Sequence, residues 1–349
     1  MSIEDVDSSV MEKFDQQIWE DIIAWQQRQN KTRKLPSKLE KARTKVGEVA
    51  SSAKDRASEV PGIGLVMESF QNSMQGLMDI ISKAGESSVR DKAVLKRYKK
   101  KRGHDFHEID EILGLPLKEV IKTKPNLELK YSSVVMVEGG AVGFVTTGGT
   151  TSAILGAGVG GVGSLPGVGI TAGAIATDIA AVMAASSRVI AETAAYYGFD
   201  LKYPNEQVFA SSILSLALSP SDGAQKQAAF TAMNRLMGDL ARREGWNQLN
   251  KNVVTQLMSK VYSSLGVRLT QKKLAQAVPV LGIAVGAGLN AKMLKNTAMT
   301  ADYMYRQRFL IEKYNLRDTL AGRPHTIDSD VEEDVDLLLK TVLDPDANF

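Results

Sequence analysis

Apolar and polar positions along this chain repeat with the period of an α-helix in most segments. In residues 10–30, large apolar side chains recur every three or four residues, which places them on one face of a helix. They are Val10, Phe14, Ile18, Ile22 and Trp25. Strand-like alternation is almost absent, and the valine-rich run 134–145 is the one exception. We therefore predict under about a tenth of the residues in strands, and an N-terminal helix that covers part of the core.

A long stretch between Tyr131 and Arg188 contains no Lys or Arg, and its only charged residues are Glu138 and Asp178. Glycine recurs there at four-residue spacing, which lets helix backbones approach each other closely. A second segment of small residues follows Pro279. A run with so little charge must be buried in protein or in lipid. We predict an all-α, multi-helix bundle with a central layer of Gly/Ala-rich helices.

Composition divides the chain into three parts. Residues 1–60 contain the N-terminal amphipathic helix and a basic linker, 61–320 form a helical domain, and 321–349 form an acidic C-terminal tail. The absence of cysteine excludes disulfides and thiolate metal sites, and fits a reducing compartment. The acidic N-terminus lacks the apolar core of a secretory signal, so we expect a cytoplasmic protein.

The two acids between Tyr131 and Arg188, Glu138 and Asp178, are candidate functional residues. An ionised carboxylate in apolar surroundings is costly unless it is paired or heavily hydrogen-bonded. Asp178 and Asn290 follow similar Pro- and Gly-containing patterns at similar spacing, so we expect them on comparable, neighbouring helix faces. With Glu138 and Arg306 they make a candidate buried polar cluster. Three interpretations remain open: structural acids with donors, a small polar cavity, or catalysis.

The net charge of +3 hides a strong asymmetry along the chain. Residues 31–102 carry 18 Lys and Arg against 8 Asp and Glu, whereas 328–349 carry eight acids and one Lys. The densest basic cluster is a candidate anionic-lipid patch formed by Lys96, Arg97, Lys99, Lys100, Lys101 and Arg102. A solvated helix face is the alternative. Nucleic acid is not expected, because Tyr98 is the only aromatic residue in the cluster.

Metal and cofactor motifs are weak. His104 and His107 stand three residues apart beside Glu108, but no third ligand follows nearby. Residues 156–161 match GxGxxG without the strand and acid that a dinucleotide site requires. We expect no metal and no cofactor.

Four motifs in order resemble the EcsC family of bacterial proteins. They are Glu138-Gly139-Gly140, Ala195-Tyr196-Tyr197-Gly198-Phe199-Asp200, the small-residue segment Pro279–Asn290, and Arg306-x-Arg308-Phe309-Leu310. The resemblance covers roughly residues 90–320. It implies a connection with bacterial membranes and secretion, and it supplies no catalytic residues.

Residues 134–186 and 277–290 are each interrupted by Pro, Gly or polar residues, so neither is a convincing membrane span. Asp178 would cost roughly 2.5–3.5 kcal/mol at the centre of a spanning helix. We therefore expect a non-enzymatic protein in peripheral or conditional contact with a membrane surface or lipid, accessory to transport or envelope processes. A protein partner is also a candidate. The alternative is an enzyme or a lipid or small-molecule binder that uses the buried polar cluster.

Overall fold

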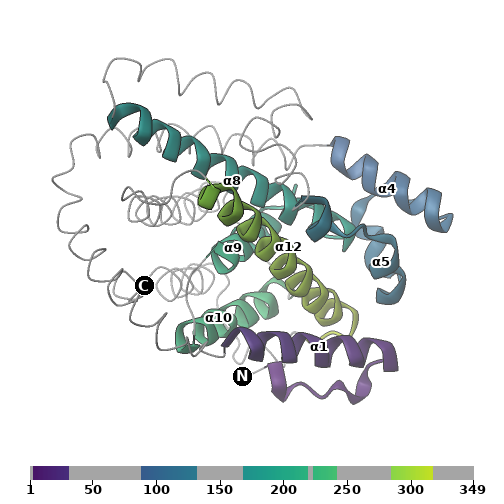
Figure 1. Ribbon diagram of the computed structural model, residues 1–349. Coiled ribbons are helices and arrows are strands. Elements are labelled where there is room, and N and C mark those ends of the chain that lie inside the picture. The colour runs from purple at the N-terminus through teal and green to yellow at the C-terminus, as the bar shows by residue number, and fades with distance from the viewer. Residues whose placement is uncertain (1–2, 31–87, 132–167, 219–222, 242–283, 317–349) are drawn as a thin grey trace.

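The computed structural model describes residues 3–30, 88–131, 168–218, 223–241 and 284–316 (Figure 1). Every regular element within these ranges is a helix, so the all-α prediction is confirmed. The valine-rich run 134–145 and the glycine repeats before residue 168 lie outside the described residues. The low strand content predicted for them stays a prediction.

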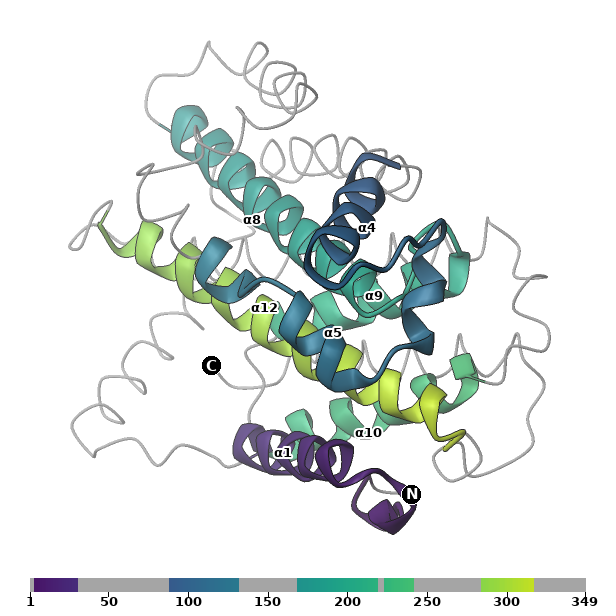
Figure 2. The same cartoon turned by 90° about the vertical axis from the view of Figure 1, so that its right-hand side faces the viewer.

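Two long helices form the centre of the bundle. α8 (Val168–Tyr196) and α12 (Ala284–Lys313) share the most extensive contact between any two described elements, and they run past each other through the middle of the molecule (Figure 1, Figure 2). Ala185 and Ala298 lie in the contact, where small side chains let helix backbones approach. The predicted central helices are therefore present and meet through alanine side chains, whereas the part of their glycines in this contact stays a prediction.

The helix α9 (Pro204–Leu218) packs against both central helices and is buried almost all round. This burial agrees with its composition, because a helix without a charged face belongs in a core. The hydroxyls of Ser211 and Ser212 donate to backbone carbonyls one turn earlier, at 2.8 and 2.9 Å. These bonds allow the two polar side chains to be buried at little cost.

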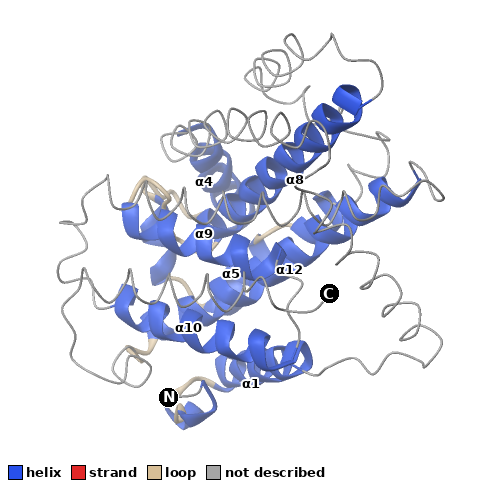
Figure 3. Cartoon of the chain, turned by 90° about the vertical axis from the view of Figure 1, so that its left-hand side faces the viewer, coloured by secondary structure: helices blue, strands red, loops and turns tan. Residues whose placement is uncertain are grey.

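A second layer consists of α1 (Lys13–Asn30) and α10 (Gly223–Ala241), which pack on each other and on α12 (Figure 3). Ile22 and Trp25 of α1 are buried, as the amphipathic pattern predicted. The Trp25 ring stacks on Tyr303 of α12 with 4.5 Å between the ring centroids. Val10, the first member of the pattern, is 61% exposed because it lies in a separate 3-10 turn, η2 (Ser8–Val10).

The turn between α8 and α9 depends on a glycine. Gly198 has φ +86°, a left-handed conformation that glycine adopts without strain, and it follows the end of α8. A Cβ at this position would lie 2.9 Å from Cγ of Leu113, which belongs to the 3-10 segment η3 (Ile109–Gly114). Glycine is therefore required both by the turn and by the close approach of η3.

The helices α4 (Ser88–Arg102) and α5 (Leu117–Thr123) lie on one flank of the bundle (Figure 2). Within the described ranges, no helix is long and apolar enough to cross a membrane. The boundaries predicted at residues 60 and 320 lie outside the described residues and stay predictions.

Candidate functional site

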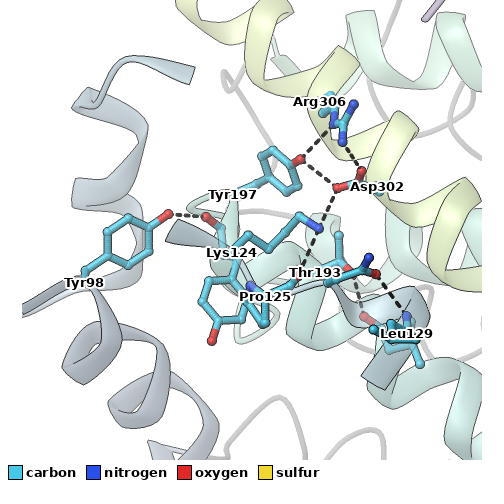
Figure 4. A network of polar contacts seen from close by, with 11 residues as sticks. Tyr98, Lys124, Pro125, Leu129, Thr193, Tyr197, Asp302 and Arg306 are labelled. Carbon is cyan, nitrogen blue, oxygen red and sulfur yellow. Dashed lines mark hydrogen bonds and ion pairs between the residues drawn. The ribbon is translucent and has the colours of Figure 1, made fainter. Parts of the chain in front are cut away.

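The first candidate site is the basic helix α4. It faces the bundle with Val94 and Tyr98, both buried and four residues apart. The Tyr98 hydroxyl donates to the backbone carbonyl of Tyr196, at 2.7 Å, where α8 ends (Figure 4). Burial raises the pKa of Tyr98, which keeps this hydroxyl a donor. The only aromatic residue of the basic cluster is therefore a core residue and is not free to stack on a ligand.

Three cations of the predicted lipid patch bind other parts of the protein. Nε of Arg97 donates to the Thr123 carbonyl at 2.7 Å, and Nε of Arg102 donates to the Thr123 hydroxyl at 3.0 Å. Both arginines thereby hold the last turn of α5, where cations are favourable. Nζ of Lys99 lies 2.8 Å from Oδ2 of Asp105. The two arginines thus stabilise the contact between α4 and α5, and the charge of Lys99 is neutralised by Asp105.

The remaining cations of α4 face solvent. Lys92, Lys96 and Lys100 stand four residues apart and share one side of the helix, and we call them the lysine row. All three, and the neighbouring Lys101, are exposed, and none has an ion pair or hydrogen bond to the part of the chain that the structure describes. Like charges at this spacing destabilise a helix by a few tenths of a kcal/mol, about as much as an exposed ion pair stabilises it. Binding an anionic partner would offset that repulsion.

The structure changes the predicted patch in two ways. Arg97, Lys99 and Arg102 have partners within the protein, so only Lys96, Lys100 and Lys101 of the predicted six are unpaired in the described structure. Lys92 was missed, although its four-residue spacing from Lys96 was visible in the sequence.

The second candidate site is a polar network between α8, α12 and the end of α5 (Figure 4). The Tyr197 hydroxyl donates to Oδ1 of Asp302 at 2.7 Å and accepts from Nε of Arg306 at 3.1 Å. Arg306 also donates to Oδ2 of Asp302, one turn earlier on α12. Nζ of Lys124 reaches Oδ1 of Asp302 at 3.0 Å. Among these groups two cations meet one carboxylate, which leaves one positive charge in excess.

The ionisation of this network follows from burial and charge. Burial, and then the Asp302 carboxylate, raises the pKa of Tyr197 well above its ordinary value. Burial alone would lower the pKa of Arg306, but Tyr197 and Asp302 outweigh it, and the pKa is raised. Tyr197 therefore stays neutral and Arg306 stays charged, so neither group is suited to exchange protons near neutral pH.

A third polar group is buried deeper, between α9 and α12. Arg308 donates to both carboxylate oxygens of Glu206, and its guanidinium lies 4.5 and 4.6 Å from the ring centroids of Phe199 and Phe209. The side chains of Arg308 and Glu206 are only 2% and 7% exposed. The two rings and the carboxylate enclose the guanidinium, so this pair is built to hold helices together.

The residues of the predicted polar cluster are only partly placed. Of the four, only the Arg306 side chain lies in the described part, and Tyr197, Asp302 and Lys124 surround it. Asp178 and Asn290 lie on α8 and α12, but their side chains are outside the described part, as is Glu138 altogether. That Glu138, Asp178 and Asn290 join Arg306 stays a prediction. The Asp302–Arg306 spacing of four residues was a signal in the sequence for part of this network.

The histidine motif is explained by local structure. Nε2 of His104 lies 2.7 Å from Oε1 of Glu119 on α5, and the imidazole stacks on Phe106 with 5.1 Å between the rings. His107 is exposed. No group of three residues suited to hold a metal ion occurs among the described residues.

The model of the EcsC protein family matches residues 16–310. The chain belongs to the EcsC family. Its match to the family model runs from α1 through most of α12, and so begins well before residue 90, where the motif resemblance started.

Two curated relatives of the chain come from Bacillus subtilis (strain 168). "Uncharacterized protein YdbA" is 26% identical over 256 residues, which is 71% of this chain and 81% of that protein. "Protein EcsC" is 28% identical over 149 residues, which is 42% of this chain and 57% of that protein. No solved structure matches the chain.

Two motifs that carry the EcsC resemblance contact each other in the structure. The hydroxyl of Tyr197, in the motif 195–200, accepts from Nε of Arg306, in the motif 306–310, and the Phe199 ring stacks on Arg308. Arg306 and Arg308 stand two residues apart, so they leave α12 on different sides, and each finds a partner in the turn after α8. The two motifs are thus one structural unit that joins α8, α9 and α12.

Proposed function

We propose that this EcsC-family chain is a non-enzymatic protein that associates peripherally with anionic membrane surfaces through α4. It would act as an accessory to a transport or envelope process, the role that the family resemblance implies. The observation that carries the proposal is the lysine row of Lys92, Lys96 and Lys100, exposed and without an ionic partner in the described structure.

The expected strength of this contact is moderate. A lysine near an anionic membrane surface contributes about 1 kcal/mol, so the row contributes about 3 kcal/mol, a factor of roughly 100 in binding. Such binding is reversible and weakens as salt screens the charges. Arg97 and Arg102 orient the row, because they tie the opposite side of α4 to Thr123.

The test is co-sedimentation of the full chain with phosphatidylcholine vesicles containing from zero to about 40 mol % phosphatidylglycerol. We compare the natural chain with a row variant, Lys92→Gln, Lys96→Gln and Lys100→Gln. The matched control, Lys13→Gln, Arg235→Gln and Lys292→Gln, removes the same charge from exposed positions on α1, α10 and α12.

We expect binding that rises with the anionic lipid content, falls with salt, and drops at least about tenfold in the row variant. The control variant should keep most of the binding. Equal losses in both variants would mean that only net charge matters, and would contradict a site on α4. Failure to bind at any lipid composition would contradict the proposal as a whole.

A second candidate function is the binding of a small anionic ligand near Arg306. The excess positive charge of Lys124 and Arg306 over Asp302 favours it. The test is a thermal-shift titration with inorganic phosphate or glycerol phosphate, comparing the natural chain with Arg306→Gln. Stabilisation that requires Arg306 would support this candidate, and the same titration curve in both proteins would contradict it.

A further inference from the structure

The lysine row on α4 has an oppositely charged counterpart in the same chain. Residues 328–336 read DSDVEEDVD, so six of nine residues are acidic and none is basic. The whole stretch 328–349 contains a single Lys. The row is the densest group of exposed cations without a partner in the described structure. The two features are complementary in charge, and the six acids of the segment are more than enough to pair with the three lysines of the row.

We propose that the acidic segment 328–336 docks on the lysine row of α4 and competes there with anionic lipid. The competition rests on the proposed membrane function, whereas the docking contact itself does not. The docked segment would then lower the affinity of the chain for weakly anionic membranes. Strongly anionic membranes would displace the segment from α4. Membrane association would become conditional on surface charge.

The position of α12 makes the contact accessible. Nζ of Lys313 lies 2.7 Å from Oδ2 of Asp15, and the Tyr314 hydroxyl donates to the same oxygen at 2.8 Å. The end of α12 is thereby fixed against α1. From Leu316, the last described residue, to Asp328 the chain can span up to about 40 Å when extended, enough to reach across a domain of this size.

Several contacts made at once favour α4 over other cations. Exposed cations elsewhere stand singly, such as Lys13 on α1 and Arg235 on α10, or at most in a pair, Lys118 and Lys122 on α5. The lysine row spans nine residues of helix and about 12 Å from end to end, so a short acidic segment can meet all three cations together. A single exposed ion pair contributes only about 0–1 kcal/mol, so a docked segment needs several. A tethered segment is also at an effective concentration of about 1 mM or more.

The docking contact is tested without lipid by zero-length carbodiimide cross-linking of the full chain, followed by peptide mass spectrometry. We expect cross-links from 328–336 to Lys92, Lys96 or Lys100 that disappear in high salt. Lys13 and Lys292 serve as internal reference positions. Cross-links spread evenly over all exposed lysines, or directed mainly to the basic residues of 31–60, would overturn the proposal.

The competition is tested with a tail variant in which the six acids of 328–336 are replaced by Asn or Gln. On vesicles with about 10 mol % phosphatidylglycerol, we expect this variant to bind about fivefold or more tightly than the natural chain. In the background of the row variant the same change should have little effect. An equal gain in both backgrounds would show that the acids act by general repulsion and would overturn docking on α4.

Failure of this proposal is distinguishable from failure of the membrane function. If no variant binds vesicles, the membrane function fails, and the cross-linking still decides whether the segment docks on α4. If vesicles bind through the row but the tail variant binds like the natural chain, the membrane function stands and the competition is overturned.

Discussion

Arg308 on α12 donates to both carboxylate oxygens of Glu206 on α9, although the two residues are 102 positions apart in the sequence. The rings of Phe199 and Phe209 lie on the guanidinium and exclude water. A buried ion pair of this kind is costly to break, because removing one partner leaves the other charge uncompensated. It is the deepest polar contact of the unit formed by the two family motifs.

Replacing Arg308 by Leu should therefore lower the free energy of unfolding by about 3–5 kcal/mol. The double variant Arg308→Leu, Glu206→Leu should recover part of this loss, because it leaves no unpaired charge. Urea denaturation followed by circular dichroism measures both changes. If the double variant loses as much stability as Arg308→Leu and Glu206→Leu lose together when each is made alone, the assignment of the pair is contradicted.

The glycine after α8 allows a graded test of backbone strain and close packing. Gly198→Ala should destabilise by about 2 kcal/mol or more, because φ is +86° and the new methyl group meets Leu113 at 2.9 Å. Gly103→Ala, with φ +78° and open space around it, should cost only about 1 kcal/mol. Gly114→Ala has neither constraint and should be nearly neutral. Thermal unfolding that ranks the three in another order would contradict this account.

A chain of buried amides joins three helices. Nε2 of Gln26 on α1 donates to Gln307 on α12 at 2.8 Å, and Gln307 donates to Asn234 on α10 at 2.8 Å. Gln307→Leu leaves both neighbours without this partner, and should cost about 2–4 kcal/mol. Gln27→Leu, which removes an exposed contact to Glu4, should cost under about 0.5 kcal/mol. Chemical denaturation distinguishes the two, and equal losses would contradict a specific role for the amide chain.

Lys226 predicts a dependence of stability on pH. Its side chain is buried and donates to the Leu216 carbonyl at 2.7 Å in the last turns of α9, and burial lowers its pKa to about 8. Between pH 8 and about 10.5 the unfolded chain keeps this proton and the folded chain has lost it, so stability rises with pH. The unfolding free energy of the natural chain, relative to that of Lys226→Met, should therefore rise across that window by about 3 kcal/mol.

The measurement is urea denaturation of both proteins from pH 7 to 10.5. Lys92→Met, at an exposed position on α4, is the matched control and should show no such change with pH. A constant difference between the natural chain and Lys226→Met would contradict the lowered pKa.

Local patterns in the sequence were sufficient to predict the class of fold. Helical periodicity predicted α1 and the burial of Ile22 and Trp25, and a glycine such as Gly198 is typical of a helix end. The density of Lys and Arg identified α4 as the basic helix. These features depend on neighbours within one or two turns, and such neighbours are visible in the sequence itself.

Only the tertiary structure decided which charged groups are paired. The sequence placed Arg97 and Arg102 in a lipid patch, but in the structure both donate hydrogen bonds to Thr123 of α5. Arg306 finds Tyr197, a residue 109 positions earlier, because α8 and α12 pack side by side. Helical period determines which side of a helix a residue occupies, but the partner on that side comes from the packing of distant segments. The lysine row and Lys101 remain exposed on α4, whereas Arg97, Lys99 and Arg102 have partners within the protein.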